Sequence, residues 1–361
     1  TLACGTGFNL TLKPLPEALV PEVYRQQYDQ IPQHIKSYVF SPKPDGVRYF
    51  LVFFHNRQTP PARIAVLVDR THTLYELPAD DLPERLFAGT VLDGELTQVG
   101  PRQYVFLAFD CLMSYGNKTS VLRYDHRIEL AREVVFRMNN NRYEGRRPLP
   151  MGAHLPYALP IALRPETSHL ALPAGQLPFL LAVKPIFALS GLADYHRRIP
   201  QPGALPFAYD GLVFTDLRDP AYPFRLRPTS VLKWKPRMAD FSENTIDFMV
   251  TARTGPENVL QDWVPKFRPA DPRIAAFRRF DPQQTNVWLW SMLPDKSAFC
   301  FSGGCSELQS FVPNRIYECR WNYRLQNWEV VRWRNKDLNM WETVILTVQN
   351  IIEDIQFEEL L

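Results

Sequence analysis

The sequence predicts an α+β protein with two domains, a larger N-terminal domain of antiparallel sheets with helices and a smaller C-terminal β-barrel. Three observations support this fold class. The chain has 361 residues, of which 45% are apolar, enough for two hydrophobic cores. Strand-like segments flanked by amphipathic stretches fill the chain up to about residue 240. After that point short strand candidates follow one another at close spacing.

The N-terminal domain is expected to span residues 1–239. Residues 14–38 predict a helical stretch broken by prolines. From residue 47 the apolar pattern changes to period two and to continuous runs, which predict antiparallel strands. These strands are "VRYFLVFFH", "ARIAVLVDR", "GTVLDGELTQ" and "QYVFLAFDCL". Residues 120–138 carry apolar residues at helical spacing after a serine cap. Residues 139–180 have weak periodicity, so we expect a long loop or insertion there. Strand signals return in "FLLAVKPIF", "DGLVFTDL" and "SVLKWKP".

The C-terminal domain is expected to span residues 240–345. Five short strand candidates with turn residues between them suit a small barrel of the OB type. They are "NTIDFMVTA", "NVWLWSML", "AFCFSG", "RIYECRWNY" and "NWEVVRWR". The chain then ends in "ETVILTVQNIIEDIQFEELL", an amphipathic helix. We expect this helix, residues 346–361, to pack back on the first domain.

Composition restricts the function classes. The formal charge is only +3, so any site for a polyanion must be local. The five cysteines are odd in number and sparse, which argues against a disulfide framework. Cys300 and Cys305 lack the second tight pair of a typical zinc site, so core positions are the simpler interpretation. No apolar run reaches the length of a membrane span, and we expect an intracellular protein without membrane association.

Lys43 is the first candidate catalytic residue. It lies between two prolines, before Asp45-Gly46 and Arg48, so we expect a stiff loop at a strand edge. A neighbouring cation disfavours the ammonium form, which makes the amine a nucleophile near neutral pH. A surface lysine in a hairpin turn is the alternative.

Two Asp-Gly pairs and a lysine pair follow along the chain. Asp93-Gly94-Glu95 ends an apolar run, and its carboxylates suit Mg²⁺ or ribose hydroxyls; an Asp-Gly hairpin turn is the alternative. Asp210-Gly211 leads into another strand in the same way. Lys233 and Lys235 would project to one face of a strand, with Trp234 opposite. Two ammonium groups on one face suit a phosphate, although solvated lysines on an edge strand would give the same pattern.

The order of these signals is more specific than any one of them. Lys-x-Asp-Gly-x-Arg, Asp-Gly-Glu, a strand with Phe-Asp, Asp-Gly-Leu-Val and Lys-x-Lys follow one another from about residue 36. This order resembles the covalent nucleotidyltransferases, which comprise DNA ligases, RNA ligases and mRNA capping guanylyltransferases. The segments "DGLVFT" and "VLKWKPRMADFSENTIDFMV" are similar to the capping branch.

The resemblance implies a two-step reaction on GTP with Mg²⁺ or Mn²⁺. Lys43 would attack the α-phosphate, pyrophosphate would leave, and the 5′-diphosphate end of an RNA would take the GMP. Arg48 and Glu95 would hold the ribose. Phe109 would stack on the guanine, unless it is a core aromatic, and Lys184 would contact guanine O6. The remaining implied roles are metal binding by Glu95 and Asp210, α-phosphate binding by Lys233 and Lys235, and action near the α-phosphate by Asp247.

A last motif lies in the predicted barrel. "NWEVVRWRNKD" is similar to the family pattern Trp-x₃-Arg-x-Arg-x-Asp-Lys, with Trp328, Arg332 and Arg334 matching. The pattern implies that these arginines and Lys336 bind the β and γ phosphates. Lys336 and Asp337 stand in the reverse of the family order. The stretch also interleaves basic and aromatic residues, which would suit an RNA strand as well as an amphipathic barrel.

Three function classes follow from these residues. The leading one is an mRNA guanylyltransferase, the second an ATP-dependent polynucleotide ligase, and the third a non-catalytic binding module with the same fold. Intact Lys43, Glu95, Lys233 and Lys235 argue against the third. The expected partners are an RNA triphosphatase, a cap methyltransferase and RNA polymerase. The resemblance implies a location in the nucleus if the protein is cellular, and in the cytoplasm or the virion if it is viral.

Overall fold

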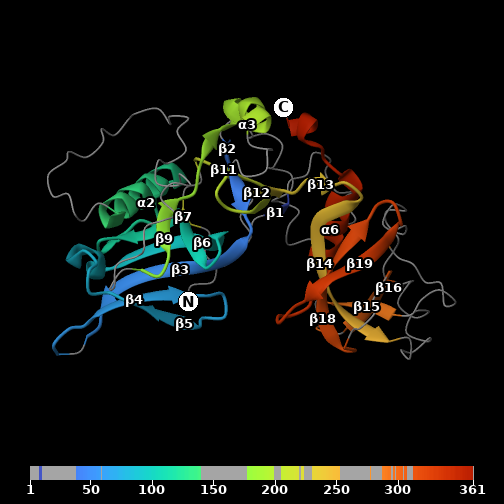
Figure 1. Ribbon diagram of the computed structural model, residues 1–361, viewed down its shortest axis with the longest axis horizontal. Coiled ribbons are helices and arrows are strands. Elements are labelled where there is room, and N and C mark those ends of the chain that lie inside the picture. The colour runs from blue at the N-terminus through green and yellow to red at the C-terminus, as the bar shows by residue number, and fades with distance from the viewer. Residues whose placement is uncertain are drawn as a thin grey trace. The chain divides into compact units, whose positions relative to one another are not determined.

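The computed structural model describes residues 8–9, 38–57, 59–139, 177–198, 205–218, 221–222, 230–252, 277, 287–293, 296, 298–303, 305–306 and 312–360. The chain divides into two compact units (Figure 1). Most of the first unit is His34–Lys233, and most of the second is Trp234–Leu361. The division falls a few residues before the expected domain boundary at residue 240. Most of the predicted helical stretch 14–38 and of the predicted loop 139–180 lies outside the described residues, and Tyr38, the last residue of the predicted helical stretch, lies in a strand.

The first unit contains two sheets. The larger has the order β5-β4-β3-β6-β7-β8, with β9 pairing β7. Its strands are β3 (Gly46–His55), β4 (Arg63–Val68), β5 (Leu74–Leu77), β6 (Thr90–Gly100), β7 (Gln103–Ser114), β8 (Asn117–Lys118) and β9 (Leu180–Val183). The smaller has the order β1-β12-β11-β2-β10. Its strands are β1 (Phe8–Asn9), β2 (Tyr38–Pro44), β10 (Phe187–Ala188), β11 (Tyr209–Asp216) and β12 (Val231–Trp234).

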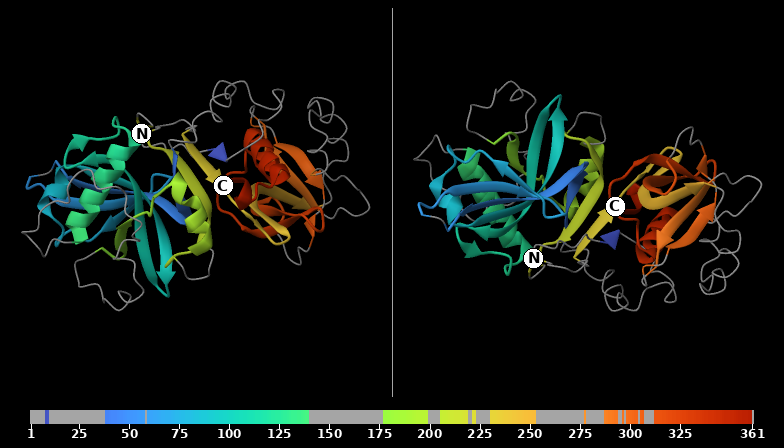
Figure 2. Two further views of the ribbon diagram at one scale, coloured as in Figure 1. Left: turned by 90° about the horizontal axis from the view of Figure 1, so that it is seen from above. Right: turned by 90° about the horizontal axis from the view of Figure 1, so that it is seen from below.

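Helix α2 (Tyr124–Asn139) covers one face of the larger sheet (Figures 1 and 2). It buries Ile128, Ala131, Val134 and Val135, positions at the helical spacing that the sequence predicts for 120–138. They pack against strand residues such as Leu51 and Phe106. The short elements η3 (Glu84–Ala88), η6 (Leu189–Gly191) and α3 (Leu192–Arg198) complete the described part of this unit.

The opposite face of the larger sheet carries a second, smaller apolar cluster. Because successive side chains of a strand alternate between faces, Phe50 and Val52 point away from the α2 side while Leu51 and Phe53 point toward it. Phe50 packs there with Val91 and Tyr222. The candidate functional side chains of this sheet lie on the same face.

The second unit is a mostly antiparallel sheet with the order β16-β15-β14-β18-β19-β17, and β13 pairs β14. The strands are β13 (Arg237–Met238), β14 (Phe241–Ala252), β15 (Val287–Met292), β16 (Ala298–Gly303), β17 (Cys305–Ser306), β18 (Arg315–Asn322) and β19 (Asn327–Trp333). All five predicted strands of this region are present. Among the described strands no pairing closes the sheet, so the predicted closed OB barrel is not confirmed.

The C-terminal helix differs from the expectation in its bounds. Helix α6 spans Trp341–Glu353 and is followed by η7 (Phe357–Leu360). Its apolar residues Val344, Ile345, Val348 and Ile351 lie in the core of the second unit, with Trp321 and Trp328 among others. The expectation that residues 346–361 also pack on the first domain stays a prediction.

Candidate active site

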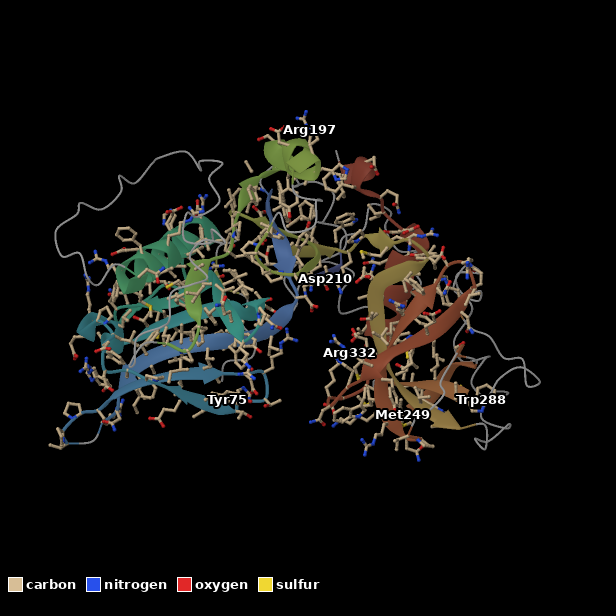
Figure 3. The ribbon with its side chains drawn as sticks, viewed as in Figure 1. Tyr75, Arg197, Asp210, Met249, Trp288 and Arg332 are labelled. Atoms are coloured by element: carbon tan, nitrogen blue, oxygen red, sulfur yellow. The ribbon has the colours of Figure 1, made fainter. Side chains whose placement is uncertain are left out.

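Lys43 lies within strand β2, whereas the sequence pattern predicts a loop at a strand edge. Strand β2 pairs with β11, and the register shifts between Tyr209 and Leu212, at Asp210-Gly211. Such a bulge re-aims a side chain, and Gly211 has a φ of 152° that favours glycine. As a result, Lys43 Nζ and Asp210 Oδ1 are 2.6 Å apart. Figure 3 labels Asp210 on its strand. The prolines on either side of Lys43 offer no N–H group to the ladder, which is why the sequence pattern does not predict this strand.

Two glycines of the Asp-Gly motifs are required by packing. A Cβ atom at Gly46 would lie 2.5 Å from the Leu96 carbonyl oxygen, and one at Gly94 would lie 2.4 Å from the Phe106 ring. Gly94 stands inside strand β6, paired with β3 and β7. The alternative of an Asp-Gly hairpin turn at residues 93–94 is therefore excluded.

Arg48 and Glu95 are direct cross-strand partners in the β3–β6 register. The Arg48 guanidinium, however, bonds to Asp93, which lies two register positions further along the β3–β6 pairing. Nε donates to Oδ1 at 2.9 Å and Nη2 to Oδ2 at 2.6 Å. Asp93 is fully buried. Burial raises the pKa of Glu95, and the nearby charges of Lys43, Arg70, Lys184 and Arg48 partly offset this.

Phe109 faces two cations. Lys184 Nζ lies 4.9 Å and Arg48 Cζ 5.3 Å from its ring centroid, within cation–π range. Strand β9 runs parallel to β7, and the Lys184 N–H donates to the Ala108 carbonyl at 2.8 Å. Burial lowers the pKa of Lys184 to about 8, and Glu95 works against this shift. The side chains predicted to bind the base thus converge on this ring.

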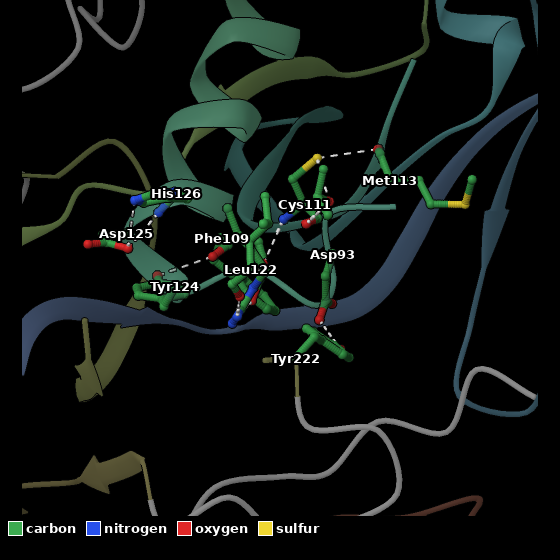
Figure 4. A network of polar contacts seen from close by, with 12 residues as sticks. Asp93, Phe109, Cys111, Met113, Leu122, Tyr124, Asp125, His126 and Tyr222 are labelled. Atoms are coloured by element: carbon green, nitrogen blue, oxygen red, sulfur yellow. Dashed lines mark hydrogen bonds and ion pairs between the residues drawn. The ribbon is translucent and has the colours of Figure 1, made fainter. Parts of the chain in front are cut away.

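The backbone around Phe109 is held from helix α2 (Figure 4). The Tyr124 hydroxyl donates to the Phe109 carbonyl at 3.2 Å. The buried Arg127 donates to both carboxylate oxygens of Asp110, at 2.8 and 3.0 Å. Burial raises the pKa of Asp110 to about 6, although Arg127 lowers it. Motif spacing did not indicate Tyr124 or Arg127, because their partners lie on another element.

Lys233 lies in strand β12, which ends at the buried Trp234, so Lys235 stands just after the strand and not within it as expected. Trp234 Nε1 donates to the Ile355 carbonyl at 2.9 Å. Lys235 Nζ donates to the Glu243 carbonyl at 3.0 Å. The division between the two units falls between Lys233 and Trp234.

In the second unit the basic motif residues gather around two carboxylates. Asp247 pairs with Lys336 and lies 3.6 Å from Arg334 Nε. Arg332 Nε donates to Glu318 Oε2 at 2.6 Å, and Figure 3 labels Arg332 on its strand. Burial raises the pKa of Glu318, but hydrogen bonds from Thr245 and Arg332 outweigh it and leave the pKa lowered. The sequence analysis missed Glu318, which shares a register pair with Arg332. Trp328 is a core residue whose Nε1 donates to the Phe277 carbonyl.

The carboxylates of the candidate site are the side chains that could bind a divalent metal ion. Among the described residues no group of three or more His, Cys, Asp or Glu side chains is arranged to hold a metal ion. Mg²⁺ in phosphoryl-transfer sites uses one or two carboxylates together with substrate phosphates. Glu95 and Asp210 each offer one carboxylate of this type. None of the described helices is long and apolar enough to cross a membrane.

Comparison with known proteins agrees with the motif order. Residues 24–148 match the family model for the mRNA capping enzyme, catalytic domain. The mRNA-capping enzyme subunit alpha of Saccharomyces cerevisiae (strain ATCC 204508 / S288c) is 24% identical over 371 residues, with 88% of this chain and 71% of that protein covered. Among solved structures, the chain is similar to a mycobacterial DNA ligase D complexed with ATP and MES, at 13% identity and a TM-score of 0.42, with 93% of this chain and 96% of that chain covered. It is also similar to a structure from work on Lig E DNA ligases, at 13% identity and a TM-score of 0.36, with 92% of this chain and 99% of that chain covered.

The family model and the yeast relative confirm the resemblance inferred from the motifs. The function that these findings support is that of a nucleotidyltransferase, and within that class that of an mRNA guanylyltransferase of the capping enzyme type.

Proposed function

We propose that the chain transfers GMP from GTP through a covalent Lys43–GMP intermediate to the 5′-diphosphate end of RNA, which forms the GpppN cap. The observation that carries the proposal is the Lys43–Asp210 contact at 2.6 Å. A strand lysine held by a carboxylate is fixed in position for attack on a phosphorus atom. In the first step Nζ releases a proton to solvent, the Nζ–P bond forms, the bond between the α-phosphorus and the bridging oxygen breaks, and pyrophosphate leaves. In the second step a terminal RNA phosphate oxygen displaces Lys43.

The first unit would bind the nucleoside. Phe109 would stack on guanine, and Lys184 would donate to O6. Arg48 and Glu95 would meet the ribose. Glu95 and Asp210 would hold Mg²⁺ or Mn²⁺, which when bound neutralises charge on the phosphates. Burial of Glu95, which raises its pKa, favours a cation as its partner.

The phosphates would be bound by cations from both units. Lys233 and Lys235 would grip the α-phosphate, with Asp247 acting near it. Arg332, Arg334 and Lys336 would contact the β and γ phosphates, since guanidinium forks match phosphate oxygens. The antiparallel strands and helix of the second unit support an OB-type domain for it. We also propose that RNA triphosphatase and cap methyltransferase activities belong to other domains or chains.

Labelling with radioactive nucleotide tests this function. Wild type incubated with α-labelled GTP and Mg²⁺ should retain label after denaturation, and Lys43→Ala should retain none. Lys43→Arg should also fail, because guanidinium stays protonated. Lys118→Ala, at an exposed lysine on β8, is the matched control and should label normally. Label from ATP instead of GTP would favour the polynucleotide ligase, and full labelling of Lys43→Ala would reject the nucleophile.

A further inference from the structure

Tyr222 lies in the segment between β11 and β12, outside every motif that the sequence analysis identified. Its ring is buried in the apolar cluster on the active-site face of the larger sheet, with Phe50, Val68 and Val91. Its N–H donates to the Ser120 carbonyl at 2.7 Å. Both the ring and the backbone of Tyr222 are therefore fixed against the sheet that carries Arg48 and Glu95.

The hydroxyl of Tyr222 completes a closed set of hydrogen bonds. It donates to Asp93 Oδ2 at 2.5 Å and accepts from Arg48 Nη2 at 2.9 Å. Asp93 in turn accepts both bonds of the Arg48 fork. Figure 4 shows the Tyr222–Asp93 contact. A fully buried carboxylate is costly unless its oxygens are satisfied, so the hydroxyl stabilises Asp93 as the anchor of Arg48.

This arrangement restricts a long side chain. A free arginine has about 2 kcal/mol of rotamer entropy to lose on binding, and groups ordered in advance avoid that cost. The bonds to Asp93 and Tyr222 hold the guanidinium 5.3 Å from the Phe109 ring centroid. They also attach Tyr222, which stands between β11 and β12 in the sequence, to the larger sheet of the unit.

We propose that Tyr222 is a positioning residue of the guanylyltransferase reaction, which acts through Asp93 to keep the Arg48 guanidinium in place for the nucleotide. The inference rests on the proposed function, in which Arg48 meets the ribose of GTP. Tyr222 itself forms and breaks no bond in the reaction.

The test is a double-mutant cycle on formation of the Lys43–GMP adduct. Tyr222→Phe keeps the buried ring and removes only the hydroxyl. Because a hydrogen bond between a neutral and a charged group contributes roughly 1.5–3 kcal/mol, kcat/KM with GTP should fall about tenfold or more. In an Arg48→Ala background the same change should cost less than about twofold. Tyr195→Phe is the control, since the buried Tyr195 hydroxyl has no hydrogen-bond partner among the described residues; it should leave kcat/KM unchanged.

A ribose readout separates positioning from general structure. Wild type should lose activity with 2′-deoxy- or 3′-deoxy-GTP, and Tyr222→Phe should lose less than wild type does, because its Arg48 already contributes less. The inference is overturned if Tyr222→Phe leaves kcat/KM unchanged, or if the same change lowers kcat/KM as much in the Arg48→Ala background as in wild type. Either result leaves the proposed function in place. A wild-type chain that forms no GMP adduct overturns the proposed function and the inference with it.

Discussion

Lys184 combines a proposed contact with the guanine base with a cost to folding stability. Its folded pKa of about 8 lies below the ordinary value of 10.5 because burial disfavours the charged amine. Below pH 8 the folded and unfolded chains both carry the charge, so the full cost of burying the charge is present. As the pH rises from about 8 toward 10.5 the folded chain alone loses the proton, and this cost disappears.

We expect Lys184→Met to stabilise the first unit by a few kcal/mol at pH 7 and to weaken discrimination of GTP against ATP. Thermal unfolding at several pH values checks the first effect, and competition labelling checks the second. The stability gain should shrink between pH 8 and 10.5. A gain that is constant with pH would show that the buried charge is not its cause. Unchanged nucleotide preference would remove Lys184 from base recognition.

Single residues of the site were predictable where they belong to ordered motifs. Lys43 and Asp210 meet in the structure, as do Phe109 and Lys184, although neither pair is close in sequence. Asp93 was identified only as one of two possible carboxylates, because spacing does not tell which of them Arg48 selects. Tyr222 was not predictable, since its partner Asp93 is 129 positions away and no periodic pattern links them.

At the scale of elements, the alternation of apolar and polar residues predicted those strands of both units that carry a long apolar pattern. Helix α2 was predicted equally well from its spacing, because its apolar residues all face one sheet. Strand β2 was missed, since Pro42 and Pro44 disfavour a strand. The partner strand β11 accommodates them with a bulge at Asp210-Gly211. The sequence of β2 alone cannot predict a bulge on another strand.

Gly94 provides a test of the close contact between β6 and β7. Alanine there would place its Cβ 2.4 Å from the ring of the fully buried Phe106 and 2.8 Å from the Leu107 carbonyl oxygen. We expect Gly94→Ala to lower the free energy of unfolding by about 3 kcal/mol or more. Gly100→Ala, on the same strand, meets only the Gln103 side chain at 3.2 Å and should cost about 0.5 kcal/mol or less. Equal losses in urea unfolding would contradict the packing argument.

At the scale of the whole molecule, the candidate residues are divided between two units. Lys43 belongs to the first, while Arg332 and Arg334 belong to the second. The order of motifs predicted both sets, but it could not predict that Asp247 and Glu318 pair with the second set. If all of them act on one GTP, the reaction needs a closing and reopening motion, a type of motion that often limits turnover.

We therefore expect Arg332→Ala and Arg334→Ala to lower Lys43 guanylylation by at least 100-fold, by analogy with the loss of charged groups that stabilise a phosphoryl transfer. The same variants, loaded with GMP at high enzyme concentration, should pass it to 5′-diphosphate RNA with a smaller loss. Arg324→Ala, at an exposed arginine of the same unit, is the control. If transfer falls as far as loading, the two arginines also bind the acceptor, and the basic-aromatic stretch 315–336 becomes the RNA site.

The glycines of the Asp-Gly motifs have a consequence for reading related genes. Gly46 and Gly94 are required by close packing within the sheet, because an added Cβ atom would lie 2.5 or 2.4 Å from a neighbouring atom, and neither glycine has a side chain to contribute to the chemistry. Selection for folding alone will preserve them. A descendant that has lost catalysis should therefore keep both glycines while the codon for Lys43 drifts freely. When such paralogues are compared by their motifs, the lysine and the carboxylates indicate whether activity is retained. The glycines indicate only that the fold is retained.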